Sequence, residues 1–144
     1  MKIRLKMALA LAICCNALLL PAHADDDLVV FHAFGDKAGL ARVMDDFMTN
    51  LLADPRIGRF FAKVDQTHLK AELTDQFCAI LNGPCAYSGK PMDEVHSGLH
   101  ITEANFNALV EDLQVAMDKN NVPFSAQNKL LARLAPMHRV VVED

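Results

Sequence analysis

The chain has 144 residues, of which 52% are hydrophobic and 22% are charged, with no Trp and a single Tyr. This length suits one ordinary domain, and this composition excludes an intrinsically disordered chain. The formal net charge is −4, but Lys2, Arg4 and Lys6 are the only charged residues before Asp25, so the remainder carries −4 less +3, or −7. Such an acidic body argues against nucleic acid or an anionic membrane surface as a partner.

The first 24 residues have the three parts of a secretory signal peptide. A basic start precedes an apolar run over 7–20, and Ala22-His23-Ala24 then places small residues where a signal peptidase reads them. The run has 14 residues, fewer than a transmembrane helix needs. We therefore expect cleavage after Ala24 and one exported domain over 25–144, periplasmic or secreted and free of the membrane. An uncleaved anchor is the alternative.

Two of the four cysteines lie inside this leader, so the body retains Cys78 and Cys85. An oxidising compartment permits them to pair. A helical pattern meets Asn82-Gly83-Pro84, where glycine provides a left-handed cap and proline prevents continuation, so the chain folds back and brings Cys85 towards Cys78. We expect a disulfide between them, and two free buried thiols are the alternative.

Helical spacing of apolar residues dominates the body, and period-two alternation is short wherever it occurs. Caps and turn residues mark where the helices begin and end. In chain order we expect a short first helix over 28–34, helices over 40–51 and 69–81, an ordered loop over 87–91, a short helical piece over 92–96, a helix capped by Thr102 over 106–117, and a last helix over 124–134 that ends near Pro136. These elements predict a small all-α domain.

Five histidines follow the leader, and each is a potential metal ligand. His96 stands out because it lies one helical turn after Met92 and just before a break at Gly98, where a short segment can present an imidazole to a metal. His100, one turn further on, is the rival. The other three are expected at the surface or in a C-terminal tail: His32, His68 and His138.

Motifs for zinc hydrolysis, nucleophilic serine chemistry and nucleotide binding are absent from the sequence. One favourable histidine, eight Phe, seven Met and long apolar helix faces are instead typical of a haem protein. Haem iron takes a proximal imidazole, and the porphyrin needs an aromatic and aliphatic slot. The alternative is that these Phe and Met residues only fill a core.

From about Phe31 to Pro136 the sequence resembles the group 1 truncated haemoglobins. The segments that carry the resemblance are Phe31-His32-Ala33-Phe34-Gly35-Asp36, residues 43–48, residues 54–61, Asn82-Gly83-Pro84, residues 87–92, and Met92-x-x-Val95-His96 followed by Ile101-Thr102 and Phe106. The resemblance implies an all-α truncated globin, a two-over-two helical sandwich with helices B and E over G and H and a short F segment. It also implies haem b, bound non-covalently.

The resemblance assigns His96 as the proximal ligand of the haem iron. It implies that Phe61 packs on the porphyrin. Further haem-contacting positions are implied for Phe47, Leu69, Leu73 and Phe77 on the distal side, for Val95, Phe106 and Leu109 on the proximal side, and for Tyr87 with His68 or Lys70 near the propionates.

Two departures from the family pattern concern the distal side. Met48 stands where relatives often carry Tyr, and Leu73 stands where they often carry Gln. Neither side chain donates a hydrogen bond to iron-bound O₂. We therefore expect reversible binding of O₂, NO and CO with fast loss of O₂.

Three alternatives remain open for the function. Met48, His68 or His100 as a sixth iron ligand would make an electron-transfer protein with a redox partner protein. The same haem would serve an enzyme that consumes NO or peroxide, although an efficient NO dioxygenase needs stably bound O₂. The last alternative is a haem-free helical interaction domain.

Overall fold

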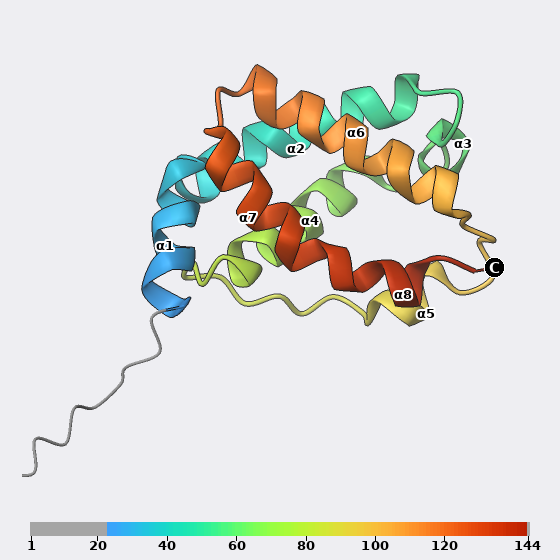
Figure 1. Ribbon diagram of the computed structural model, residues 1–144. Coiled ribbons are helices and arrows are strands. Elements are labelled where there is room, and N and C mark those ends of the chain that lie inside the picture. Colours follow the sequence, from blue (N-terminus) through green and yellow to red (C-terminus); the bar gives the residue numbers. More distant parts are fainter. Residues whose placement is uncertain (1–22, 144) are drawn as a thin grey trace, which may run out of the picture.

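The computed structural model describes residues 23–143, with side chains from Leu28 onward, and this part of the chain is helical without strands (Figure 1). The predicted signal peptide lies outside the described residues except for its last two, which begin the first helix. The helices are α1 (His23–Ala33), α2 (Asp36–Ala53), α3 (Gly58–Phe61), α4 (Gln66–Ile80), α5 (Met92–His96), α6 (Glu103–Lys119), α7 (Phe124–Leu134) and α8 (His138–Val141), with a 3₁₀ turn η1 (Ala135–Met137) between the last two.

Local signals in the sequence set the helix ends. Gly35 adopts a left-handed conformation with φ of 81° immediately before α2, as glycine does readily. The Asp65 side chain caps α4 by accepting a hydrogen bond from the His68 amide. Thr102 and Asn105 form a reciprocal capping box at the start of α6. The expected helices are therefore confirmed, with boundaries that differ by a few residues from the apolar stripes.

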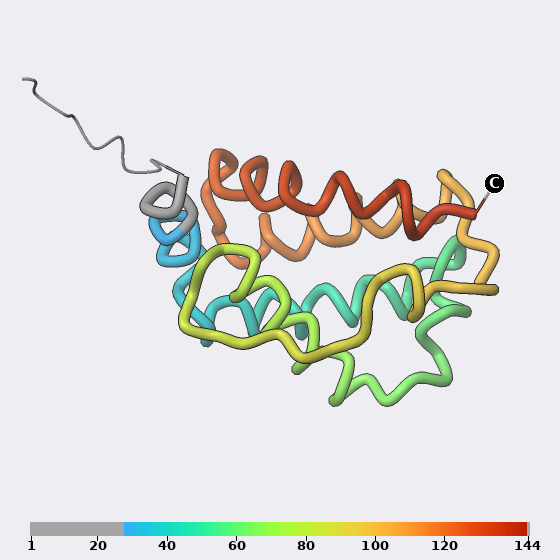
Figure 2. Tube along the Cα trace, turned by 90° about the horizontal axis from the view of Figure 1, so that it is seen from below, coloured from blue at the N-terminus to red at the C-terminus, as the bar shows by residue number. Residues whose placement is uncertain are grey.

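Two layers of helices make up the molecule (Figure 2). Helices α2 and α4 pack together in one layer, α6 and α7 lie in the other, and α2 also packs against α6. The long helices thus form the predicted two-over-two sandwich. No helix within residues 23–143 is both long and apolar enough to cross a membrane.

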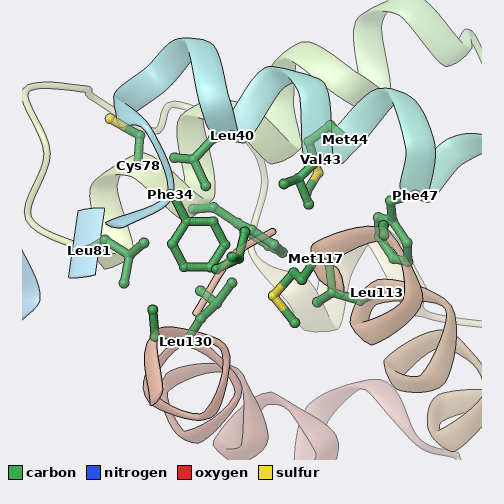
Figure 3. Packing of buried hydrophobic residues seen from close by; sticks show 14 of the residues in the cluster. Phe34, Leu40, Val43, Met44, Phe47, Cys78, Leu81, Leu113, Met117 and Leu130 are labelled. Atoms are coloured by element: carbon green, nitrogen blue, oxygen red, sulfur yellow. The ribbon is translucent and has the colours of Figure 1, made fainter. Parts of the chain in front are cut away.

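The hydrophobic core lies between the two layers. Helix α2 buries apolar residues spaced three or four positions apart, which is the period of one helix face. In Figure 3, Phe34, Met117 and Leu130 point into the same interior from three different parts of the chain. Other fully buried members of this core are Leu40, Val43, Met44, Leu51, Leu81 and Leu113.

The chain reverses after α4 in a manner that differs from the sequence prediction. Asn82, and not Gly83, adopts the left-handed conformation, with φ of 54°. The Gly83 amide donates to the Cys78 carbonyl at 2.8 Å, which closes the helix end. A side chain at position 83 would meet Cys78 Sγ and the Phe31 ring at under 3 Å, so glycine is needed here for space. The Cα atoms of Cys78 and Cys85 lie 5.8 Å apart, a separation typical of a disulfide.

The expectation of a C-terminal tail at His138 is wrong. Pro136 lies in the first turn of η1, where the proline needs no amide donor, so the chain continues through η1 into α8. The half-buried His138 ring packs edge-on against Phe106, with the ring centroids 4.9 Å apart. Helix α8 also packs against α5, so the last described residues belong to the fold.

Candidate functional site

The short helix α5 presents the histidine that the sequence singled out. The Nδ1 atom of His96 donates a hydrogen bond to the Met92 carbonyl at 2.7 Å, one helical turn earlier. A ring whose Nδ1 carries the proton leaves the lone pair of Nε2 for a metal, and a backbone partner of this kind is typical of metal-binding histidines. Because the ring is half-buried and Nε2 has no partner among the described residues, His96 is poised as a ligand.

The other histidines lack this combination. His100 has a side chain that is 89% exposed, and its Nδ1 lies 3.3 Å from the Glu143 carboxylate. His32 and His68 are exposed, as expected from their neighbours. His138 is half-buried, but its ring lies against Phe106. Within residues 28–143, His96 is therefore the histidine best placed to bind iron.

A cleft of about 390 Å³ lies next to α5, in the size range of small-molecule and cofactor sites. Its lining comes from α4, from the loop that follows α4, from the start of α5 and from η1: Gln76, Ala79, Ile80, Tyr87, Lys90, Pro91, Met92 and Met137. Most of these side chains present carbon or sulfur. The cleft therefore offers an apolar surface one helical turn from His96.

Tyr87 is the predicted haem-contacting residue that lines this cleft. Its hydroxyl donates to the Lys90 carbonyl at 3.2 Å. Burial, and to a lesser extent the negative charge of Glu72, raise the pKa of Tyr87 above its usual value. The Tyr87 hydroxyl, which an ordinary tyrosine already keeps protonated at neutral pH, therefore remains a hydrogen-bond donor to a still higher pH.

Gln76 is a cleft residue that the sequence analysis missed. Its side chain is only 6% exposed, and its amide donates to the Met92 sulfur at 3.5 Å. A thioether is a weak acceptor, so this buried amide keeps most of its hydrogen-bonding capacity for another partner. The sequence around Gln76 gives no sign of its burial, because a glutamine next to Phe77 on a helix is usually a surface residue.

The other predicted haem-contacting residues lie in three settings. Phe47 and Phe77 are members of the buried core, with Phe61, Leu73 and Leu109 packed against it. Met48 is 4% exposed and lies outside that core cluster. The remaining predicted residues are more exposed than the core. Leu69 and Phe106 are half-buried, Val95 is 42% exposed, and Lys70 forms an ion pair with Asp45.

The donor set fits a haem iron better than a bare metal ion. Among the described residues, no three His, Cys, Asp or Glu side chains come together to hold a metal. A porphyrin supplies four nitrogen ligands itself and needs one imidazole and an apolar slot. His96, which does not itself line the cleft, would provide that imidazole, and the cleft beside Met92 would provide apolar surface.

A family model described as bacterial-like globin matches residues 29–143, which is most of the chain. The chain belongs to the bacterial-like globin family. This globin is 31% identical to the group 1 truncated haemoglobin GlbN of Mycolicibacterium paratuberculosis over 108 residues, covering 75% of this chain and 79% of that one. It is 28% identical to the group 1 truncated haemoglobin of Tetrahymena pyriformis over 100 residues, covering 69% and 83% of the two chains. The predicted resemblance to group 1 truncated haemoglobins is thus confirmed.

Solved structures show the same fold. The globin matches the Fe(III) form of truncated haemoglobin from Tetrahymena pyriformis with a TM-score of 0.76 at 24% identity, covering 80% of this chain and 98% of that one. It matches the 2/2 haemoglobin of Synechococcus sp. PCC 7002 with a TM-score of 0.71 at 21% identity, covering 78% and 97%. The latter was solved in the cyanomet state with covalently attached haem. Both matches identify the two-over-two sandwich as that of a truncated globin.

Proposed function

We propose that this globin binds haem b through His96 and uses its iron to bind O₂, NO and CO reversibly. The observation that carries the proposal is the His96 ring, held at Nδ1 by the Met92 carbonyl with Nε2 unengaged. A bound haem would supply an iron centre that accepts a diatomic ligand, with His96 as the residue that holds the iron. Membership of the truncated haemoglobins supports the same function.

The haem would have few polar neighbours on the distal side. Met48 is buried and Leu73 packs against the core, and neither side chain can donate a hydrogen bond to a ligand. Bound O₂ carries partial negative charge and depends on such a donor, whereas CO and NO depend on it less. Rapid, reversible ligand exchange therefore suits this pocket better than long-term storage of O₂.

A visible absorption spectrum tests the proposal directly. The purified full chain, or the chain reconstituted with hemin, should show a Soret band that shifts on reduction and again on addition of CO. The haem should leave the protein on extraction with acidified acetone, because we propose a non-covalent cofactor. A chain that stays colourless in the presence of hemin contradicts the function, and haem retained after extraction contradicts the non-covalent attachment.

Electron transfer is the second candidate function. For that function, the burial of Met48 favours ligation of the iron by His96 and Met48 over ligation by two histidines. Met48 is 4% exposed outside the main core, while His68 and His100 are exposed and would have to move into the pocket. Ligation of the haem iron by both His96 and the Met48 sulfur would raise the reduction potential, as in cytochromes. A low-spin ligand-free spectrum that is lost in Met48→Leu would establish this ligation. A high-spin spectrum would exclude it.

An enzyme role is the weakest of the haem-based candidates. NO dioxygenation consumes stably bound O₂, which Met48 and Leu73, as side chains without a donor, do not favour. The rate of NO consumption by the oxygenated protein separates this role from reversible ligand binding. Consumption no faster than in a hemin-only control would leave the binding function in place.

We propose further that the globin is exported and that Cys78 and Cys85 are joined in the mature protein. The leader sequence and the 5.8 Å Cα separation support this. Such a bond would stabilise the fold by about 2–3 kcal/mol, because it closes a short loop in the unfolded chain.

The paired change Cys78→Ser with Cys85→Ser is expected to lower the free energy of unfolding by this amount. Urea denaturation measures it, and dithiothreitol should produce the same loss in the unaltered chain. The serine variant should not respond to dithiothreitol. A native chain whose unfolding midpoint ignores the reductant would contradict the disulfide.

A further inference from the structure

We infer that Glu143 is a positioning residue, which holds the turn after His96 and thereby sets how α5 presents the imidazole. The inference rests on the proposed ligation of haem by His96. It concerns a residue 47 positions further along the chain, in a segment that the sequence analysis treated as a tail.

The Glu143 carboxylate accepts two main-chain hydrogen bonds from the turn. Its Oε1 accepts from the Gly98 amide at 2.7 Å, and its Oε2 accepts from the His100 amide at 3.0 Å. Gly98 and His100 both have positive φ, at 75° and 52°, and lie on either side of Leu99. One charged side chain therefore holds both ends of an unusual backbone turn, through bonds that are stronger than those between neutral groups.

The main chain adds a further contact between the same two segments. The Glu143 amide donates to the Ile101 carbonyl at 2.9 Å, so residue 143 both donates to and accepts from residues 98–101. Helix α8, just before it, packs against α5, and Val141 of α8 is buried. In Figure 1, α8 and α5 accordingly lie side by side. The segment around Glu143 is thus an anchored part of the fold that can hold α5 from outside.

Helix α5 depends on such external contacts. It has only five residues, none of them is buried, and no side chain caps its start. A helix this short has little stability of its own, because too few hydrogen bonds offset the cost of nucleation. His96 is its last residue, two positions before Gly98. Loss of the Glu143 bonds would therefore let the turn, and with it the His96 imidazole at the end of α5, move more freely.

The experiment compares Glu143→Ala and Glu143→Gln with the native globin, with and without hemin. In the hemin-free chain, amide exchange at Gly98 and His100 should accelerate by about tenfold or more in Glu143→Ala, because local opening loses both charge-assisted bonds. In the ferrous haem protein, the iron–histidine stretching band in resonance Raman spectra should broaden or shift. Hemin transfer to an excess of an acceptor apoprotein should become several-fold faster. Glu143→Gln keeps one acceptor oxygen and should lie between the two.

Glu94→Ala is the matched control. Glu94 lies on α5 and forms an ion pair with Lys90. Both side chains are exposed, and such a surface ion pair contributes little to stability. Glu94→Ala should leave amide exchange, the Raman band and hemin transfer unchanged. Unfolding midpoints of all variants show whether any effect is local or global.

The outcomes separate this inference from the haem proposal. Unchanged exchange and an unchanged iron–histidine band in Glu143→Ala would overturn the positioning role while haem binding stands. A native chain that takes up no hemin would overturn the ligation and, with it, the positioning role, even if the exchange result confirmed the turn contacts. A Glu143→Ala effect matched by Glu94→Ala would also overturn the positioning role, since loss of charge alone would explain it.

Discussion

Replacement of His96 by alanine is expected to abolish stable haem binding while leaving the helical sandwich folded. The side chain is half-buried and lies at the end of a short helix, so the core does not depend on it. Mutation of a residue that hydrogen-bonds to a metal ligand typically weakens metal affinity by about 10- to 100-fold. Loss of the ligand itself should therefore weaken hemin affinity by more than about 100-fold. Hemin titration followed at the Soret band measures the change, and far-ultraviolet circular dichroism checks the fold.

His32→Ala is the matched control for that change. His32 is an exposed histidine that lies outside α5 and does not line the cleft, so its loss should leave hemin affinity unaltered. In His96→Gly, added imidazole should restore the Soret band by occupying the space of the lost ring. An unchanged spectrum in His96→Ala would assign the proximal ligand to another residue, and a loss of hemin in His32→Ala would show that the effect is not specific to His96.

Introduction of a donor on the distal side is expected to slow the release of O₂. Met48→Tyr would place a hydroxyl at the position where related globins often carry tyrosine. A hydrogen bond to the negatively polarised O₂ contributes about 1.5–3 kcal/mol, which corresponds to a release rate about 10- to 100-fold slower. Stopped-flow displacement of O₂ from the reduced protein measures the rate, and autoxidation should slow in parallel.

Met48→Phe is the control for size, because it adds the ring without the hydroxyl. Equal rates in the Tyr and Phe variants would show that the hydroxyl does not reach the ligand. Slow O₂ release in the native globin would instead reveal a donor already in place. Gln76 is the buried amide beside the cleft, so Gln76→Leu in the same assay would then identify or dismiss it.

The local parts of the fold could be predicted from the sequence with good accuracy. Apolar residues repeat with the helical period through α2, α4 and α6, and short-range signals such as Asp65 and Thr102 mark where helices begin. These signals depend on residues within a few positions of one another, so they can be recognised in the sequence alone. The prediction that His96 binds the iron came in the same way, from its spacing after Met92 and before Gly98.

The parts of the site that the sequence did not reveal depend on distant contacts. Gln76 lines the cleft and donates to the Met92 sulfur of α5, and nothing near residue 76 in the sequence predicts that contact. Gly83 is required by the Phe31 ring and Cys78 Sγ, a steric demand that turn preferences do not contain.

By itself, the sequence determined the all-α class and the family, because periodicity, caps and motif spacing are properties of neighbouring residues. It also indicated the histidine that we propose for the iron. The tertiary structure alone decided that His138 packs on Phe106 and that Glu143 holds the turn after His96. Those contacts join residues more than thirty positions apart, and their free energy depends on which surfaces meet when the two helical layers close.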